Sequence, residues 1–193
     1  GNVLRHVNPV TFDDAGNVPD DGSGVTFAEL LARLTERGLQ LAALADRGVA
    51  VKDLTQPWQA VLAGTDPQLN VFNLEIPSGS VMSGLLDIEA PPGSTVLVNI
   101  RGADVRIRNT AMTLTGVTRD TVLFHFVDAT NIVFQGFVLT GSLLAPYASA
   151  TLSGGDVEGR AVFGGDVYTH TGFEFHNYPF NGSICVDMPG TNA

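Results

Sequence analysis

The feature that most constrains the fold of this chain is an internal repeat between residues 130 and 182. Shifting this stretch along itself by 18 positions places Thr140–Ala145 over Glu158–Phe163 and Gly136 over Gly154, so that glycine, small and apolar positions coincide. Short apolar runs that recur about every 20 residues, separated by glycine and polar residues, are typical of stacked β-coils, because each coil buries its inward side chains only against the next. The repeat therefore predicts two rungs of a β-solenoid.

A second repeat lies upstream, where Ser94–Ile107 lines up with Asp120–Phe134. Both segments begin a strand with Thr-Val-Leu, turn a polar corner and continue as another strand. The runs Val96–Val98 and Val122–Phe124 are apolar on both faces, which suits strands that face the coil interior on one side and a helix on the other. An antiparallel sandwich would also contain many short strands. The two repeats favour the solenoid over the sandwich.

One long helix is predicted at about residues 26–47. Thr26 is placed to cap its start and Glu29 to complete a capping box. Apolar residues then recur at steps of three and four, which makes one apolar stripe; they are Phe27, Leu30, Leu31, Leu34, Leu41, Leu44 and Ala45. About 20 residues at ~1.5 Å each span ~30 Å, enough to cover some six rungs at ~4.8 Å. Gly38 costs a helix about 1 kcal/mol against Ala, so we expect it to pack closely against another backbone.

These observations predict a mostly β fold with one long helix, a right-handed parallel β-helix (β-solenoid) flanked by the α-helix. Residues 1–24 are expected to form an extended lead-in, and residues 25–193 a single β-solenoid domain. Exposed end coils of such a fold need capping, which the lead-in or a neighbouring domain would supply.

The closing motifs resemble the C-terminal signature of the choice-of-anchor A domain. They are Gly141–Pro146, Asp156–Ala161, Glu174–Asn177 and Pro179–Gly182, and Asn70–Leu74 with the helix before it is also similar. That family comprises secreted bacterial surface and adhesin-like proteins. The resemblance therefore implies a bacterial cell-surface location and an adhesive role, and it brings no catalytic residues. The Asn/Phe-rich opening segment and Gly-rich strand pair usual in the family are not found before residue 25, so the chain is either trimmed or a shorter variant.

The charge balance argues against two classes of partner. Ten Lys and Arg residues stand against twenty Asp and Glu, for a formal net charge of -10. Nucleic acid and anionic lipid both require a basic patch, which this sequence lacks. No apolar run approaches the ~20 residues of a membrane span, so we expect no membrane insertion. The acidic surface is interpreted as an aid to solubility, with weak divalent-cation binding as the alternative.

The best candidate for a metal site is the set His170, Glu174 and His176, because alternate residues of a strand share one face and two imidazoles with a carboxylate suit zinc or copper. His170 and His176 are ~20 Å apart on a straight strand, so only a turn near Gly172 would unite them. We therefore predict no metal and no cofactor, and expect Glu174 and His176 to hydrogen-bond where the last coil closes. His125 is expected to be a partly buried imidazole with a hydrogen-bond partner.

An enzyme acting on polysaccharide is a further alternative. Such an enzyme needs clustered carboxylates beside a base, and the sequence offers candidates for both. The candidates are Asp156, Glu158 and Asp166 on adjacent rungs, with Arg101, Arg106 and Arg108 upstream. Such groups are more often the solvated face of strands, so we expect no catalytic residues. Covalent adhesion through Lys52 or a thioester at Cys185 is also not expected, and Cys185 is interpreted as a buried thiol.

The predicted function is a non-catalytic adhesive or structural module of an exported bacterial cell-surface protein. Its partner would be a host or bacterial surface protein or glycan, with neighbouring domains of a larger surface protein beside it. Ice binding is the alternative, since ice-binding proteins also pair a solenoid with a flanking helix. Flat ice-binding faces often carry regular arrays of Thr on successive rungs, and the Thr-x-Thr pair of Thr113 and Thr115 does not recur in the aligned rungs.

Overall fold

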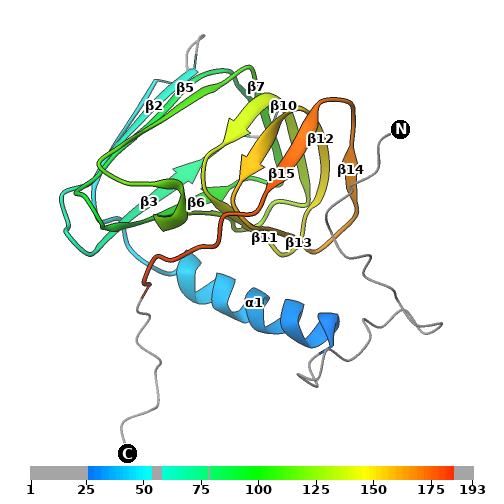
Figure 1. Ribbon diagram of the computed structural model, residues 1–193, viewed down its shortest axis with the longest axis horizontal. Coiled ribbons are helices and arrows are strands. Elements are labelled where there is room, and N and C mark those ends of the chain that lie inside the picture. Colours follow the sequence, from blue (N-terminus) through cyan, green and yellow to red (C-terminus); the bar gives the residue numbers. More distant parts are fainter. Residues whose placement is uncertain (1–25, 54–57, 78, 185–193) are drawn as a thin grey trace, which may run out of the picture.

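The computed structural model describes residues 26–53, 58–77 and 79–184, so the predicted lead-in lies outside the described residues. These residues form a β-solenoid of three sheets with one α-helix (Figure 1). The hairpin sheet contains β1 (Val49–Asp53), β2 (Trp58–Ala63), β5 (Gly84–Glu89) and β8 (Ala111–Thr115). The helix-covered sheet contains β3 (Leu69–Glu75), β6 (Thr95–Arg101), β9 (Val122–Phe126), β11 (Ser142–Ala145) and β13 (Ala161–Phe163). The polar-faced sheet contains β4 (Val81–Met82), β7 (Asp104–Arg108), β10 (Asn131–Leu139), β12 (Ser149–Glu158), β14 (Val167–Thr169) and β15 (Phe173–His176).

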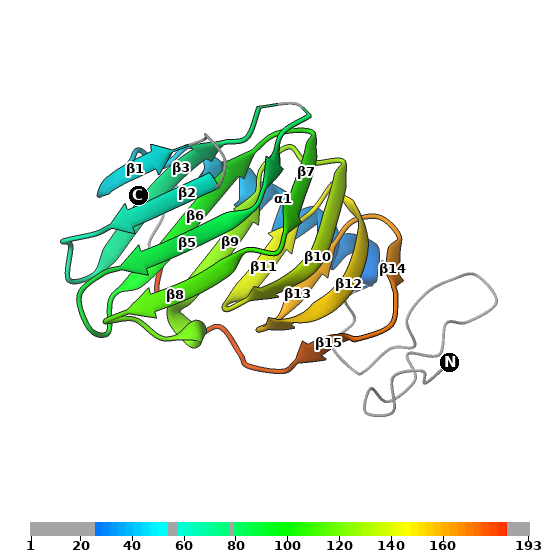
Figure 2. The same ribbon diagram turned by 90° about the horizontal axis from the view of Figure 1, so that it is seen from above.

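The pairing of these strands confirms the solenoid and excludes the sandwich. Within the described residues every pair of strands is parallel except the β1–β2 hairpin. Parallel neighbours cannot be joined by a tight turn, so the chain travels around the other sheets before it returns beside itself. Figure 2 shows the successive strands of each sheet stacked side by side along one axis.

Both sequence repeats correspond to the stacking register. In the first repeat Leu143 pairs with Ala161 and Leu139 with Val157, which is the 18-residue shift found in the sequence. In the second, Val96 pairs with Val122, a shift of 26 residues. The longer coils pass through all three sheets, whereas the last ones skip the hairpin sheet. The solenoid therefore narrows toward its C-terminal coils, as Figure 1 shows.

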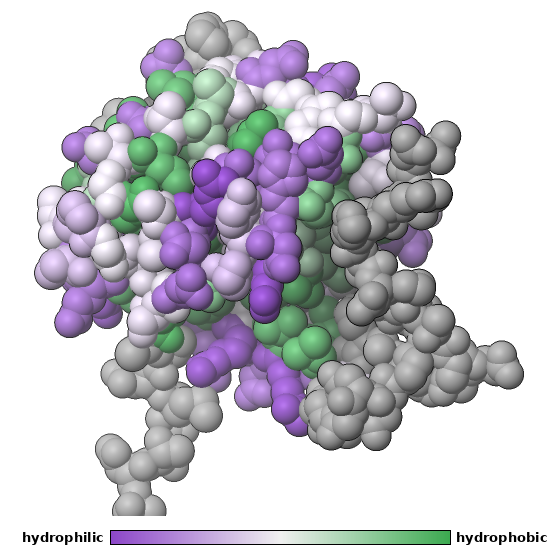
Figure 3. All heavy atoms as spheres, in the orientation of Figure 1, coloured by the Kyte–Doolittle hydropathy of each residue, from purple (hydrophilic) through white to green (hydrophobic). Residues whose placement is uncertain are grey.

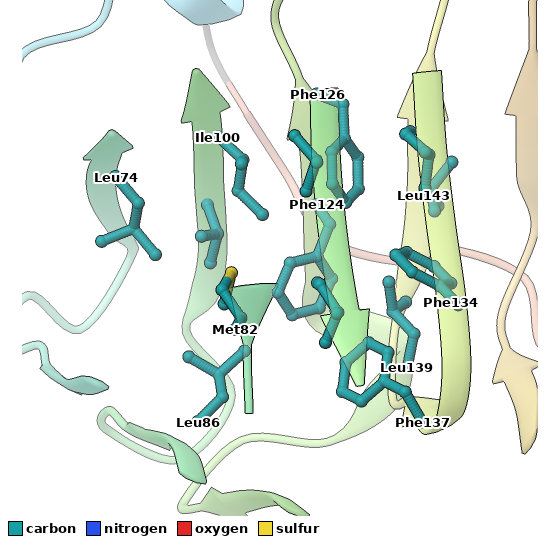
Figure 4. Close-up of a cluster of buried hydrophobic side chains, with 14 of the residues drawn as sticks. Leu74, Met82, Leu86, Ile100, Phe124, Phe126, Phe134, Phe137, Leu139 and Leu143 are labelled. Carbon is teal, nitrogen blue, oxygen red and sulfur yellow. The ribbon is translucent and has the colours of Figure 1, made fainter. Parts of the chain in front are cut away.

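The core is a column of apolar side chains enclosed by the three sheets. Its largest fully buried members include Phe124, Phe126, Phe134 and Phe137, and the Phe134 and Phe137 rings meet edge to face with centroids 5.3 Å apart. Figure 4 shows these rings gathered in the core from β9 and β10, which belong to two different sheets. Burying four such rings together supplies several kcal/mol of the free energy of folding, because each buries ~150–250 Å².

The helix α1 spans Phe27–Ala42 and starts at the predicted capping box, in which the Thr26 Oγ1 accepts from the Glu29 N–H and the Glu29 carboxylate accepts from the Thr26 N–H. It covers one face of the solenoid as predicted, but it ends at Ala42 and not near residue 47. The reason is tertiary: the Asp46 carboxylate accepts from the Asn73 backbone N–H at 2.7 Å, and Arg47 bridges to Val71. These contacts pull the chain into the sheet before the next helical turn can form.

A row of polar side chains on the helix-covered sheet holds the C-terminal half of α1. Asn73, Asn99 and His125 are register partners on β3, β6 and β9. The Asn99 amide donates to the Leu41 carbonyl at 2.9 Å, and the Asn73 amide donates to the Leu44 carbonyl. Carbonyl groups in the last turn of a helix lack partners within it. The asparagines of this row therefore supply the hydrogen bonds that water would otherwise give to the carbonyl groups at the end of the helix.

Gly38 packs against this row, although its neighbour is a side chain and not the backbone predicted above. A Cβ on Gly38 would lie 2.9 Å from Nε2 of His125, whose ring is fully buried. His125 Nδ1 lies 2.9 Å from Asn99 Oδ1, and since the Asn99 amide nitrogen already donates twice, Nδ1 carries the proton. His125 is thus a buried imidazole with a hydrogen-bond partner, as predicted.

Candidate ligand-binding face

The three sheets differ in how much of their outer face is free to meet a partner. Leu41 of α1 packs on Val71, Leu97 and Leu144, so the helix closes the outer face of the helix-covered sheet. This contact also accounts for the runs that are apolar on both faces, since Leu97 and Leu123 point to the helix while Val96, Val98 and Phe124 point to the core. Only the hairpin sheet and the polar-faced sheet keep uncovered outer faces among the described residues.

The polar-faced sheet presents a flat grid of hydrogen-bonding side chains. On β10 and β12 the residues between the buried ones point outward, and the register aligns them in rows across the strands. The three rows are Asp104–Asn131–Ser149, Arg106–Val133–Thr151 and Arg108–Gln135–Ser153. Strands ~4.8 Å apart, with outward side chains at every second residue, make this a regular lattice in which every position except Val133 carries a donor or an acceptor. We call these nine residues the polar grid.

One corner of the polar grid is held in place by an ion pair. The Arg106 Nη2 lies 2.8 Å from the Asp104 Oδ2, and the Asn131 amide donates to the other Asp104 oxygen at 2.6 Å. These hydrogen bonds, that from Arg106 first, hold the pKa of Asp104 below its usual value. Both Asp104 oxygens are therefore occupied at neutral pH. Two serines of the grid are also engaged, since Ser149 Oγ accepts from the Asp166 N–H and Ser153 Oγ donates to the Phe134 carbonyl.

The outer face of the hairpin sheet is acidic and less regular. Thr113 and Thr115, on the edge strand β8, are exposed there as the Thr-x-Thr pair predicted from the sequence. Their register partners on β5 are Asp87 and Glu89, and the Thr113 hydroxyl donates to the Asp87 carboxylate. A threonine pair beside carboxylates lacks the repeated Thr array expected of a flat ice-binding face.

The three candidate metal ligands are only partly brought together. Glu174 Oε2 lies 3.0 Å from His176 Nε2, which matches the predicted hydrogen bond at the last coil. His170 follows β14, and its side chain is exposed. Among the described residues, no group of three His, Cys, Asp or Glu side chains is arranged to hold a metal ion. Phe173 and Phe175, which alternate with Glu174 and His176 along β15, pack against the core.

The Glu174–His176 pair belongs to a larger cluster of charges across β12 and β15. Asp156 is the register partner of Glu174, and Glu158 that of His176. The Glu174 hydrogen bond, followed by smaller contributions from nearby carboxylates, raises the pKa of His176. Burial raises the pKa of Asp156, and the neighbouring Glu158 and Glu174 charges add to that effect.

Arg119 closes this cluster and was not anticipated from the sequence. It lies in the short 3-10 turn Arg119–Thr121, its Nη1 is 2.8 Å from Glu158 Oε1, and its guanidinium stacks 4.4 Å from the centre of the Tyr178 ring. The Asn181 N–H also donates to the Asp120 carbonyl at 2.7 Å. Together these contacts fasten the segment after β15 to the body of the solenoid.

The constellation proposed for a polysaccharide-acting enzyme does not assemble. Glu158 is paired with Arg119, whereas Asp166 lies beside Ser149 at the opposite end of β12. Arg101 belongs to the helix-covered sheet and donates to the Ala42 carbonyl, so it does not join Arg106 and Arg108 on the polar-faced sheet. Cys185 and the side chain of Lys52 lie outside the described part of the chain.

An apolar groove of about 360 Å³ lies between α1 and the helix-covered sheet, with Leu34, Leu144 and Val162 in its wall and Arg37 and Arg160 in its lining. Hydrophobic residues gather in Figure 3 where β11 and β13 approach α1. No described helix is both long and apolar enough to cross a membrane.

The sequence was also compared with known proteins. Residues 2–177 match the model of a family described as "Putative Ice-binding-like adhesive domain". No match was found among curated proteins or among solved structures. Because the family model covers most of the chain, the protein belongs to this ice-binding-like adhesive domain family. The adhesive interpretation of the sequence is thereby confirmed, while the choice-of-anchor A resemblance stays a prediction.

Proposed function

From this family membership we propose that the chain is a non-catalytic adhesive module of an exported bacterial cell-surface protein, and that it meets its partner through the polar grid. The observation that supports the proposal is the difference between the outer faces of the three sheets. The helix covers the outer face of one sheet, and on another the two exposed threonines pair with carboxylates. The third sheet presents three aligned rows of outward side chains, all of them polar except Val133.

The chemistry of the polar grid favours a partner with an extended polar surface. Gln135 and Thr151 offer both donors and acceptors to a ligand. Asn131, Ser149 and Ser153 each make one hydrogen bond within the protein and keep further hydrogen-bonding capacity. Because these side chains lie at fixed spacing on parallel strands, the protein loses little entropy on binding a rigid ligand. Tyr168, exposed on β14 next to Thr151, adds an aromatic ring at the margin. Hydroxyl-rich glycan on a host or bacterial surface is the class of ligand that this combination suits best.

Two finer assignments belong to the same proposal. The closing motifs, from Gly141–Pro146 to Pro179–Gly182, support a relationship with the choice-of-anchor A domain. Secretion and neighbouring domains of a larger surface protein follow from that relationship. The absence of a catalytic role is supported by the scattered positions of Asp166 and Arg101 relative to Asp156 and Glu158.

The test compares one substitution on each uncovered face. Thr151→Lys places a long cation in the middle row of the polar grid, and Thr115→Lys makes the same change on the hairpin sheet. Wild type and both variants are screened on glycan and protein arrays, with intact bacteria as the control surface. We expect Thr151→Lys to weaken binding by about tenfold or more, as loss of a central contact does, and Thr115→Lys to leave it within about twofold.

Thermal hysteresis of the same three proteins separates glycan from ice. A freezing-point gap that is lost in Thr151→Lys and kept in Thr115→Lys would show that the polar grid is the binding face and that its ligand is ice. Loss of binding in Thr115→Lys alone would show that the ligand contacts the hairpin sheet, and it would refute the polar grid as the binding face.

A further inference from the structure

The polar grid continues onto β14, so each of its three rows gains one residue. At one end of β14 the His170 N–H donates to the Leu152 carbonyl at 2.8 Å, and at the other end the Asp166 carbonyl accepts from the Ala150 N–H at 2.8 Å. Both bonds continue the parallel register of β12 with β14. Figure 2 shows β7, β10, β12 and β14 side by side in this order. The extended rows are Asp104–Asn131–Ser149–Asp166, Arg106–Val133–Thr151–Tyr168 and Arg108–Gln135–Ser153–His170.

The two outer rows differ in charge. The first row begins and ends with a carboxylate, that of Asp104 and that of Asp166, and we call it the acidic row. The third row begins with Arg108, ends with His170 and holds no carboxylate, and we call it the basic row. Four residues at ~3.3 Å each separate the two rows, which are therefore ~13 Å apart. Because charges are screened over ~8 Å at physiological ionic strength, the acidic row does little to offset the charge of the basic row.

Arg108 is the one charged residue of the polar grid without an oppositely charged partner among the described residues. Arg106 and Asp104 pair with each other at 2.8 Å, whereas Arg108 makes no ion pair with another described residue. Arg108 is half-buried, and its Nε is enclosed without a hydrogen-bond partner in the described part of the chain. Burial removes water from this guanidinium without supplying an acceptor, so part of its hydrogen-bonding capacity is unmet.

The surroundings of Arg108 suit an anion. Gln135, its neighbour in the basic row, is exposed, and its amide can donate to the same anion. Just beyond the basic row, Gly136 of β10 and Gly154 of β12 have φ angles of 61° and 55°, and glycines of this kind mark bends in a strand. The buried positions change there from even to odd residue numbers. Asp156 therefore points outward beyond the bend and not within the basic row.

We propose that the basic row binds the carboxylate of an acidic glycan, with Arg108 and Gln135 as the residues that contact it. The inference rests on the polar grid being the glycan-binding face, and it adds the charge of the ligand. A guanidinium binds a carboxylate through two parallel N–H···O bonds, which a neutral hydroxyl group does not reproduce. On the hairpin sheet, by contrast, Asp87 and Glu89 lie beside the exposed threonines and repel the same ligand.

The test compares acidic glycans with their own methyl esters, which keep the sugars and lose the charge. Polygalacturonate represents an acidic chain and sialyllactose an acidic terminal sugar. Their affinities for the protein are measured by calorimetry at about 0.15 M salt, where long-range charge effects are screened. We expect wild type to bind at least one acid about tenfold or more tightly than its ester. The pair that shows this preference identifies the source of the carboxylate.

Three variants locate the preference. Arg108→Gln removes the charge and keeps an amide, and Arg33→Gln makes the same change of net charge at an exposed position of α1, away from the polar-faced sheet. Gln135→Glu gives Arg108 a carboxylate neighbour on an exposed position, so it competes with the ligand even where Arg108→Gln fails to fold. We expect Arg108→Gln and Gln135→Glu to reduce the preference for the acid to less than about twofold, and Arg33→Gln to leave it within about twofold of wild type.

Each other outcome counts against the proposal. Equal binding of acids and esters by wild type would overturn it, as would binding of neither or a preference that survives in Gln135→Glu. Loss of the preference in Arg33→Gln as well would show attraction to charge in general and not a site at Arg108. Thr151→Lys, measured on the uncharged esters, reports on the polar grid itself. If it weakens ester binding while wild type shows no preference for acid, the polar grid stays the binding face and only the role of the basic row is refuted.

Discussion

Acidification should destabilise this fold through one buried side chain, His125. Burial, with a smaller contribution from the Arg101 charge, lowers its pKa from 6.5 to about 4. The unfolded chain therefore binds a proton at His125 between pH 6.5 and about pH 4 that the folded chain does not bind. Stability rises with pH wherever the unfolded state holds more protons, so the free energy of unfolding should fall as the pH drops through this window.

The size of the effect follows from the two pKa values. With 6.5 for the unfolded state and about 4 for the folded state, His125 alone removes about 2.5 kcal/mol of stability between about pH 7 and about pH 4.5. Geometry supports a penalty of this order, because Nε2 faces Gly38 in the helix contact and Nδ1 is engaged by Asn99. A second proton would leave a cation buried there without a carboxylate partner.

The measurement is urea unfolding of wild type and His125→Gln at the two pH values. Gln does not titrate and its amide can still donate to Asn99, so the carboxylates that titrate in both proteins cancel in the comparison. We expect wild type to lose about 2.5 kcal/mol more than His125→Gln on acidification. Equal losses in the two proteins would refute the reasoning, because His125 would then not be held neutral by its burial.

Three further predictions concern other contacts. Gly38→Ala should lower the free energy of unfolding, measured by urea, by about 1–3 kcal/mol, since a Cβ 2.9 Å from His125 outweighs the gain in helix propensity, and a stabilised variant would contradict this packing. Arg119→Gln should reduce stability by only about 1 kcal/mol, because the ion pair with Glu158 is partly exposed, and thermal unfolding measures it against wild type. The pKa of His176, measured by NMR, should lie above 6.5, and Glu174→Gln should lower it. The His176–Glu174 hydrogen bond stabilises the fold at low pH, and this stabilisation is lost as the pH rises through the folded-state pKa. A pKa of His176 that is unchanged by Glu174→Gln would exclude this contact as the cause of the shift.

Repetition in the sequence was sufficient to predict the solenoid, because stacking places equivalent residues of successive coils side by side. The 18-residue shift of Leu143 onto Ala161 and the 26-residue shift of Val96 onto Val122 are both the observed register. The capping box at Thr26 was equally readable, since an N-cap is a local hydrogen-bonding pattern. The same repeat would have revealed the polar row, because Asn73, Asn99 and His125 recur at the same 26-residue interval within apolar strands.

Contacts between residues far apart in the chain could not be predicted in this way. The early end of α1 at Ala42 depends on Asp46 reaching Asn73, and the fastening of the last segment depends on Arg119 reaching Glu158 and Tyr178. Neither pairing repeats, so the sequence carries no periodic signal for it.

The sequence by itself determined the coil, its periods and its helix, because those follow from backbone hydrogen bonding and the alternation of apolar side chains. Only the tertiary structure decided which outer face stays free, since that depends on where α1 packs and on which side chains meet Thr113 and Thr151 across neighbouring strands.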